Sequence, residues 1–456
     1  MKDRIFLFRL FVLALTVRWG LALILYLLMG NDAFFGTDSR GFFGWISEHV
    51  EHLQQGRVSG WQWLGPNLSL LPVPSLLWTL NGVLFGEYAA LSSILCQGAL
   101  DSYTCVLVCL AARELDARLA LPAGVASACN PTQVVMANLY YTDAIFLFFF
   151  AVVLLGAVRW LKQPDWRAAS LIGAGMGGAM LCRVVIAPWA GCLIVYLVAA
   201  PALQRQLRRE HLVQLAFAVV VAALCTAPVV GRNRTETGKW TLTTQTGAHT
   251  AFWVVPLVMQ AKNGTPWERG AEEMKRRLAE RHGPPSLDQG IESQRQAALA
   301  GEVLRKLGAV AIAKAWLYGA AINLGTPVAA IFPPLAQLPR TGFFATPGGS
   351  MPEKIANFLF RSDNALFAWS VLAGLVGVAA IRLVQLRGTI ALLARRELLP
   401  GMLLLLSWVA FILLVSGPVA SPKYRLPIEP VLAILAAAGY LALVERTASR
   451  RFAHGS

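Results

Sequence analysis

The stretch at residues 142–155, TDAIFLFFFAVVLL, places a carboxylate, Asp143, directly before a long apolar run. A second carboxylate, Asp38, follows the apolar segment at residues 5–29. Runs of this kind are typical of helices that cross a bilayer, and an acidic side chain beside one is costly unless it has a function. We therefore predict a membrane protein in which Asp38 and Asp143 contribute to one site.

The composition indicates the same class of protein. Of the 456 residues, 56% are hydrophobic and 14% are charged, and the mean hydropathy is +0.55, values that exclude an ordinary soluble domain. The formal net charge is +15, but the basic residues fall in short clusters between apolar runs, as orientation signals do. We expect no nucleic-acid partner. The seven cysteines form no CxxC pair, which predicts packing residues rather than a disulfide framework.

The positive clusters predict the orientation of the chain. Lys2 and Arg4 precede the first apolar run, so we expect a cytoplasmic N-terminus and an outer position for Asp38. The proline-containing run at residues 68–85 is predicted to lie along the membrane surface. Predicted crossings at residues 89–112 and 119–137 then return the chain outward. Asp143 would thus share the face of Asp38.

Further apolar runs complete an all-α, polytopic bundle of about ten crossings. The chain divides into an N-terminal transmembrane module at residues 1–231, which contains a catalytic first outer loop at 30–88, and C-terminal transmembrane helices at 365–456. Between them, residues 232–364 are expected to form an extracytoplasmic subdomain with interfacial or re-entrant helices. The crossings expected after Asp143 lie at residues 144–160, 168–181, 184–203 and 212–230, with three more beyond residue 364.

The two aspartates have two interpretations each. Asp38 is a candidate general base, and Asp143 is a candidate to support the base or the acceptor. Each aspartate also precedes a predicted helix, so each could instead act as an N-terminal cap. Capping and catalysis are compatible.

The segment at residues 421–430, SPKYRLPIEP, concentrates cations and an aromatic side chain between prolines at the predicted outer surface. Arg425 offers a planar fork of donors to phosphate oxygens, and Lys423 a mobile point charge. The segment is therefore predicted to bind the phosphate of a lipid. The alternative is a snorkelling anchor at the interface.

Three arginines stand out from the remaining charges. Arg183 lies between two apolar runs on the predicted outer side, against the usual bias, so we expect it to have a partner. Arg232 follows the next predicted outer helix end and is a second candidate. Arg18 lies deep in the first helix, where it could pair internally or snorkel.

Soluble nucleotide and hydrolase chemistry is not indicated, because the chain has no P-loop, dinucleotide fingerprint or GxSxG elbow. His49 and His52 flank Glu51 at helical spacing, but the order is not HExxH. We expect these side chains on the exposed face of a helix and predict no metal site.

The layout of the chain resembles the GT-C superfamily of integral membrane glycosyltransferases, in particular the bacterial branch related to protein O-mannosyltransferases and the aminoarabinose transferase. The His-Pro-Pro element often found late in the first outer loop of that family is absent. The matching segments, which span nearly the whole chain, are Thr37-Asp38-Ser39-Arg40, Phe85-Gly86-Glu87, Ala111-Ala112-Arg113-Glu114-Leu115, Asn130-Pro131, Tyr141-Thr142-Asp143-Ala144, Pro228 with Arg232-Asn233, and Lys423-Tyr424-Arg425-Leu426-Pro427 with Pro430.

The resemblance implies a bundle of ten to twelve transmembrane helices and an inverting transfer of a sugar from a polyprenyl phosphate donor. The acceptor would be a hydroxyl of a cell-envelope lipid, glycan or protein at the outer face of the inner (plasma) membrane. It implies catalytic roles for Asp38 and Asp143 and leaves a divalent cation open. The candidates for holding the donor phosphate are Arg183, Arg232, Lys423, Tyr424 and Arg425.

Two other functions use similar residues. A lipid-linked-oligosaccharide flippase or transporter also needs charges near membrane depth, but symmetric halves would be expected and no internal repeat is visible. A polysaccharide polymerase or ligase would use a polyprenyl diphosphate donor. Comparing monophosphate with diphosphate donors separates that function from the first.

Overall fold

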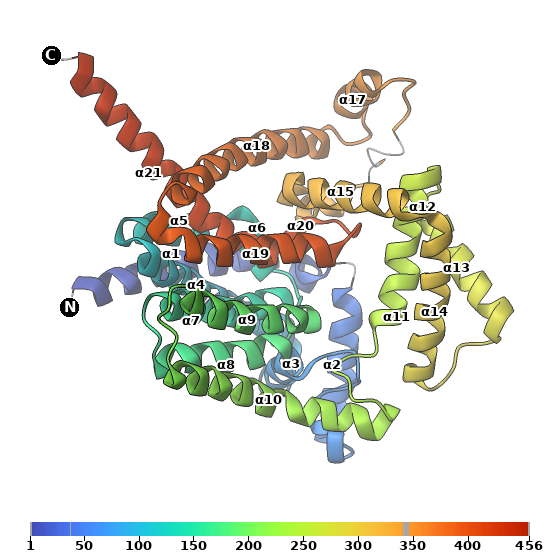
Figure 1. The fold of residues 1–456 in the computed structure, drawn as a ribbon. Helices are drawn as coiled ribbons and strands as arrows, with labels where there is room; N and C mark the ends of the chain where they lie inside the picture. The colour runs from blue at the N-terminus through green and yellow to red at the C-terminus, as the bar shows by residue number, and fades with distance from the viewer. Residues whose placement is uncertain (1, 37, 340, 342–345, 455–456) are drawn as a thin grey trace.

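The computed structural model describes residues 2–36, 38–339, 341 and 346–454, and every regular element in this part of the chain is a helix. Figure 1 shows long helices bundled side by side, with both termini toward one end. At the other end lie α2 (Ser39–Gln54) and the group α11 (Thr246–His249) to α14 (Gln289–Leu307). The predicted all-α, polytopic class is confirmed.

Eight helical segments of the described chain are long and apolar enough to span a bilayer. A ninth counts if α14 and α15 (Ala309–Gly325), which meet at a bend of 103°, form one broken span. The chain is a multi-pass membrane protein, but a count of ten to twelve is not confirmed. The eight segments are Arg4–Phe34, Pro72–Leu115, Asp143–Lys162, Val184–Leu203, Arg209–Thr237, Ala365–Leu393, Arg396–Ser416 and Pro422–Arg446.

Two predicted crossings differ from the structure for local reasons. The run at residues 119–137 is broken into α5 (Ala120–Ala128) and α6 (Pro131–Ala137). The break forms because the Asn130 side chain caps α6 and Pro131 occupies its first turn. The run at residues 168–181 forms α8 (Trp166–Met180), whose 15 residues span about 22 Å. That length is shorter than a hydrocarbon core of about 30 Å.

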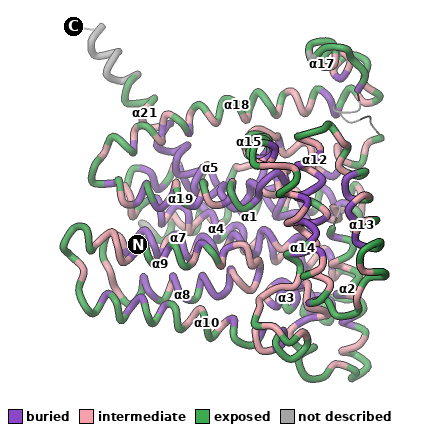
Figure 2. The backbone as a smooth tube through the Cα atoms, turned by 45° about the vertical axis from the view of Figure 1, so that its right-hand side comes forward, coloured by how far each residue is buried: buried purple, intermediate pink, exposed green. Residues whose placement is uncertain are grey.

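The centre of the bundle is formed by α4 (Ala89–Leu115) and α7 (Asp143–Lys162), which pack against each other. α1 (Lys2–Met29) and α5 pack on α4, whereas α8 packs between α7 and α10 (Arg209–Thr237). Figure 2 shows the buried residues concentrated in these central helices. By contrast, α18 (Ala365–Leu393) lies at the edge and is largely exposed.

α18 reaches the bundle mainly through α21 (Glu429–His454). Gly388 of α18 lies against the backbone of α21 at Leu435, and Gly439 of α21 lies against the backbone of α18 at Val384. A Cβ atom at either glycine would overlap the facing carbonyl oxygen. Small residues allow this backbone contact, as is common between membrane helices.

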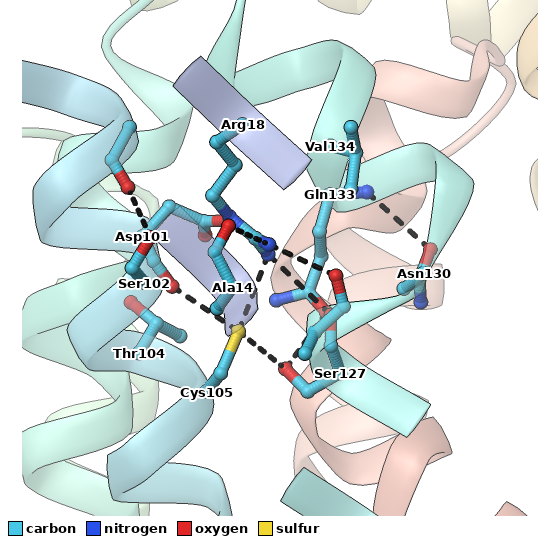
Figure 3. A network of polar contacts seen from close by, with 12 residues as sticks. Ala14, Arg18, Asp101, Ser102, Thr104, Cys105, Ser127, Asn130, Gln133 and Val134 are labelled. Carbon is cyan, nitrogen blue, oxygen red and sulfur yellow. Dashed lines mark hydrogen bonds and ion pairs between the residues drawn. The ribbon is translucent and has the colours of Figure 1, made fainter. Parts of the chain in front are cut away.

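Arg18 is fully buried in α1 and pairs with Asp101 of α4, with Nε 2.6 Å from Oδ2 (Figure 3). Its Nη1 donates to the carbonyl of Ala128 at 2.9 Å, and its Nη2 to that of Ser127 at 3.4 Å. Both carbonyls belong to the last turn of α5, where no further helical turn supplies N–H donors for them. Arg18 therefore pairs internally and satisfies the end of a helix that breaks inside the bundle.

After α10, the chain forms a group of helices with its own apolar core. A π-helical turn (Thr250–Val254) leads into α12 (Val255–Asn263), and α13 (Trp267–His282) and α14 pack around it. Val255, Met274 and Ala300 are buried in this core. After α15 the chain breaks at Thr326 and Pro327 into short turns, η7 (Val328–Ala330) and α16 (Pro333–Ala336), before α17 (Met351–Phe360) and α18.

The remaining helices are α3 (Pro72–Phe85), which packs on α2 and α4, α9 (Ala187–Leu203), and α19 (Leu399–Ser416), which packs on α7 and α9. The chain then turns through α20 (Pro422–Arg425) and η10 (Leu426–Ile428) into α21. Trp408 of α19 donates from its indole nitrogen to the carbonyl of Pro427 at 2.8 Å. This contact brings the 417–428 turn back into the bundle, next to the loop that carries Asp38.

Candidate active site

Asp38 lies at the N-terminus of α2, but its side chain makes no capping hydrogen bond. Its Oδ2 instead accepts a hydrogen bond from Lys423 Nζ at 3.0 Å, across a sequence separation of 385 residues. The Asp38 side chain is half exposed, whereas Lys423 is largely buried. The carboxylate is therefore accessible and directly beside a cation.

The loop that carries Asp38 is held against the segment before α7. The carbonyl of Phe34 accepts from the backbone N–H of Tyr140 at 2.9 Å. At Gly36, a Cβ atom would overlap the Tyr141 hydroxyl, so only glycine permits this approach. Asp38 is thus fixed close to the start of α7; Thr37, part of the predicted motif, lies outside the described residues.

Asp143 begins α7 and is 2% exposed. Its carboxylate pairs with Arg183, which follows α8 and is partly buried. The partner that we expected for Arg183 is therefore Asp143. A carboxylate in the first turn of α7 is also favoured by the helix dipole, but the N-cap position is Thr142 and no side chain makes a capping hydrogen bond there.

The two ion pairs adjoin each other. Lys423 Nζ lies 4.1 Å from the centroid of the Tyr141 ring, and Tyr141 is two residues before Asp143. Arg183 interacts electrostatically with Asp38 and with Tyr424. We call this set the charged cluster; its members are Asp38, Tyr141, Asp143, Arg183, Lys423 and Tyr424.

His249, at the end of α11, is a neighbour of the cluster that no sequence pattern indicated. Burial lowers the pKa of its imidazole, and the positive charge of Arg183 lowers that pKa further. Burial likewise lowers the pKa of Arg183, an effect opposed by Tyr424 and Asp38. His249 is therefore held neutral at pH 7 beside a cation.

Arg425 is not brought into the cluster. It is buried, and its Nε donates to Glu429 at 2.6 Å and its Nη2 to the Thr132 hydroxyl at 2.7 Å. Its Nη1 donates to the carbonyls of Asn323 and Thr326 at the end of α15. These contacts connect α6, α15 and α21, so Arg425 holds three helices together.

Arg232 also lies apart from the cluster. It is buried near the end of α10, and its Nη1 donates to the carbonyl of Asn67 at 3.3 Å. Its Nη2 is buried and has no hydrogen-bond partner among the residues that the structure describes. Of the predicted phosphate-binding residues, Arg183, Lys423 and Tyr424 therefore lie in the charged cluster, whereas Arg232 and Arg425 each lie elsewhere.

His49 is buried in α2, so the prediction that it lies on an exposed helix face is wrong. Burial lowers the pKa of its imidazole, and His52 contributes to the same shift. Within the described residues, no group of three or more His, Cys, Asp or Glu side chains could hold a metal ion. The charged cluster itself contains two cationic side chains, Lys423 and Arg183.

Comparison with protein families shows a similarity over part of the chain. Residues 65–231 match the family model of dolichyl-phosphate-mannose-protein mannosyltransferases. The matched segment contains Asp143 and Arg183 but not Asp38 or Lys423. No curated protein sequence matches the chain.

Two solved structures of ArnT from Cupriavidus metallidurans are also similar to the chain. The one bound to undecaprenyl phosphate has 16% sequence identity and covers 92% of this chain and 76% of its own, with a TM-score of 0.40. The apo structure has 17% identity and covers 96% and 78%, also with a TM-score of 0.40.

Over residues 65–231, this similarity agrees with the resemblance to membrane glycosyltransferases that the layout of the chain suggested. More particularly, the segment from residue 65 to residue 231 is similar to the mannosyltransferases named above.

Proposed function

We propose that the protein transfers a sugar from a polyprenyl phosphate to a hydroxyl group, with inversion at the anomeric carbon. The observation that carries the proposal is the 3.0 Å contact between the half-exposed carboxylate of Asp38 and the ammonium of Lys423. A base for a hydroxyl nucleophile and a cation for a departing phosphate are thereby adjacent. A polyprenyl phosphate donor is supported by the name of the family that matches residues 65–231, dolichyl-phosphate-mannose-protein mannosyltransferase.

In the proposed reaction, the acceptor oxygen forms a bond to the anomeric carbon while the bond from that carbon to the phosphate oxygen breaks. Asp38 takes the proton of the acceptor hydroxyl. The electron pair of the broken bond leaves with the polyprenyl phosphate, and its added negative charge is stabilised by Lys423 and Arg183. The products are a glycoside, polyprenyl phosphate and a protonated Asp38, which then returns its proton to solvent.

Asp143 and Tyr141 act as positioning residues in this scheme. Asp143 is buried and paired with Arg183, which fixes the guanidinium beside Asp38. The ring of Tyr141 lies under the Lys423 ammonium and would hold it when phosphate displaces the Asp38 contact. Arg425 and Arg232 were candidates for the phosphate as well, but their contacts favour structural roles.

The proposed site lies at the outer face of the inner (plasma) membrane. Support comes from Figure 1, where α2 lies at the end of the bundle opposite both termini. With a cytoplasmic N-terminus, as the positive clusters predict, that end is extracytoplasmic. The acceptor would be a hydroxyl of a cell-envelope lipid, glycan or protein, because these are the hydroxyl compounds that this face encounters.

The test is turnover by the full-length protein in lipid nanodiscs with polyprenyl monophosphate sugars and cell-envelope acceptors. Asp38→Asn should abolish release of polyprenyl phosphate without changing the thermal unfolding temperature. Asp32→Asn is the matched control, because Asp32 lies in the same loop but pairs with Arg40. Full turnover by Asp38→Asn, or turnover with diphosphate donors alone, would reject the proposal.

A further inference from the structure

A cavity of about 460 Å³ lies apart from the charged cluster, between α18, α21, η7 and the break between α5 and α6. Its volume is in the range of small-molecule sites. Small residues leave room for the cavity, namely Gly374 and Gly377 of α18 and Ala433 and Ala436 of α21. Neither Asp38 nor Lys423 lines it.

One side of the cavity is polar and carries an excess of positive charge. Arg382, Arg425 and Glu429 line it, so two positive charges face one negative charge and the net charge is +1. Arg425 and Glu429 neutralise each other in a close ion pair. The excess charge therefore belongs to Arg382.

Arg382 lies within α18, one of the candidate membrane-spanning helices. Its Nε donates to the carbonyl of Leu324 at 3.0 Å, and its Nη1 contacts Gln385. No described carboxylate lies within ion-pair distance of it, whereas the buried Arg18 and Arg425 each have one. A charge at this depth is costly without a counter-charge, so Arg382 favours an anion from outside the chain.

Part of the cavity wall lies at the exposed surface of the bundle. Ile381 on its wall is 40% exposed, and Cys129 at the α5–α6 break is exposed. Within the most apolar window of α18, 11% of the residues are buried. A ligand that enters between α5 and α18 therefore comes from the bilayer.

We propose that this cavity binds a membrane lipid through its phosphate, with the phosphate at Arg382 and the apolar chain along the small residues of α18 and α21. The phosphate supplies the missing negative charge, and guanidinium groups bind phosphate oxygens in a planar fork. The site is separate from the donor phosphate site at Lys423, and it does not depend on the transfer reaction proposed above. A phospholipid and a polyprenyl phosphate share this chemistry.

The exposed cysteines supply a direct probe. Cys129 lines the cavity, whereas the exposed Cys192 of α9 does not. Alkylation of both by N-ethylmaleimide can be followed in the full-length protein in detergent, with phosphatidylglycerol, undecaprenyl phosphate or uncharged diacylglycerol added. We expect at least one phosphate lipid to slow the alkylation of Cys129 several-fold, no effect of diacylglycerol, and no change at Cys192.

Two variants should remove the protection. Arg382→Gln should weaken it by roughly tenfold in lipid concentration, because a charge-assisted contact is lost. Gly377→Leu fills the cavity instead, since a Cβ at Gly377 meets no atom within 4 Å. Arg387→Gln is the matched control, because Arg387 lies on the same helix, donates to the Ala442 carbonyl and does not line the cavity.

Each outcome decides the proposal. The lipid that protects Cys129 identifies the source of the phosphate, and protection that persists in Lys423→Ala supports a separate site. Protection lost in Lys423→Ala would mean that the lipid is held at the charged cluster. Equal protection by diacylglycerol, unchanged protection in Arg382→Gln, or no protection by any lipid would overturn the proposal, whether or not sugar transfer occurs.

Discussion

The ammonium of Lys423 lies between two partners, the Asp38 carboxylate at 3.0 Å and the Tyr141 ring, whose centroid is 4.1 Å away. A phosphate can replace the first partner without displacing the second. The ring would therefore keep the cation in place through the reaction, at a site where Lys423 is largely buried.

Replacing Tyr141 should separate these two contacts. Tyr141→Phe keeps the ring face and should bind a polyprenyl phosphate donor within a few-fold of the wild type. Tyr141→Leu removes the cation–π contact, which contributes about 1 kcal/mol, and should weaken donor binding roughly fivefold. Titration of donor binding in nanodiscs measures both variants. Equal affinity in Phe and Leu variants would show that the ring does not hold Lys423.

Breaking the Asp143–Arg183 pair should destabilise the protein. Arg183→Gln leaves a buried carboxylate unpaired, which costs about 3 kcal/mol. The double variant Asp143→Asn with Arg183→Gln should be more stable than Arg183→Gln alone, because no buried charge remains. Thermal unfolding in detergent gives the coupling through a double-mutant cycle. Strictly additive effects would mean that the two side chains do not interact.

For the buried Arg18–Asp101 pair, removing one partner should again destabilise the protein more than removing both, and the loss of Arg18 should carry a further cost. Arg18→Met leaves Asp101 unpaired and also leaves the carbonyls of Ser127 and Ala128 without their donors. We expect a loss of about 3 to 5 kcal/mol. Asp101→Leu in the same chain should recover only part of this loss, since the α5 carbonyls stay unsatisfied. Full recovery would indicate that Arg18 serves Asp101 alone.

Acid should weaken the fold through its buried histidines. His249 and His49 both have folded-state pKa values below the ordinary 6.5, because burial disfavours the charged imidazole. The unfolded chain then binds more protons below pH 6.5, so their contribution is fully present above that pH and is lost as the pH falls. The unfolding temperature should drop between pH 7 and pH 5. His249→Gln should flatten this dependence, and an unchanged profile would count against a buried neutral His249.

Some of these features could be predicted from the sequence, because they depend on local patterns. The apolar runs define the helices, and an arginine between two apolar runs, such as Arg183, implied a partner. Asn130-Pro131 is a helix-start signal, and it breaks a run whose length alone had predicted a crossing. Glu429 lies four residues after Arg425, a spacing at which the two side chains can pair, and this pairing argues against Arg425 as a free phosphate ligand.

Other features depend on contacts between distant segments and left no local signal. The contact between Asp38 and Lys423 joins residues near opposite ends of the chain. His249 lies in a short helix of mixed composition, and its interaction with Arg183 follows from the packing of helices α11 to α14. Arg382 resembles an orientation signal in sequence, yet it lies in α18 against the end of α15.

The backbone contact of α18 with α21 at Gly388 and Gly439 leaves no room for a larger side chain at either position. Elsewhere along α18, about half of the positions are exposed, and those outside the cavity should accept any apolar side chain. In a saturation library of α18 and α21 selected for expression, substitutions at Gly388 and Gly439 should be the most strongly depleted. α18 is therefore constrained in sequence mainly near its C-terminal end, where Gly388 contacts α21, and less along the rest of its length.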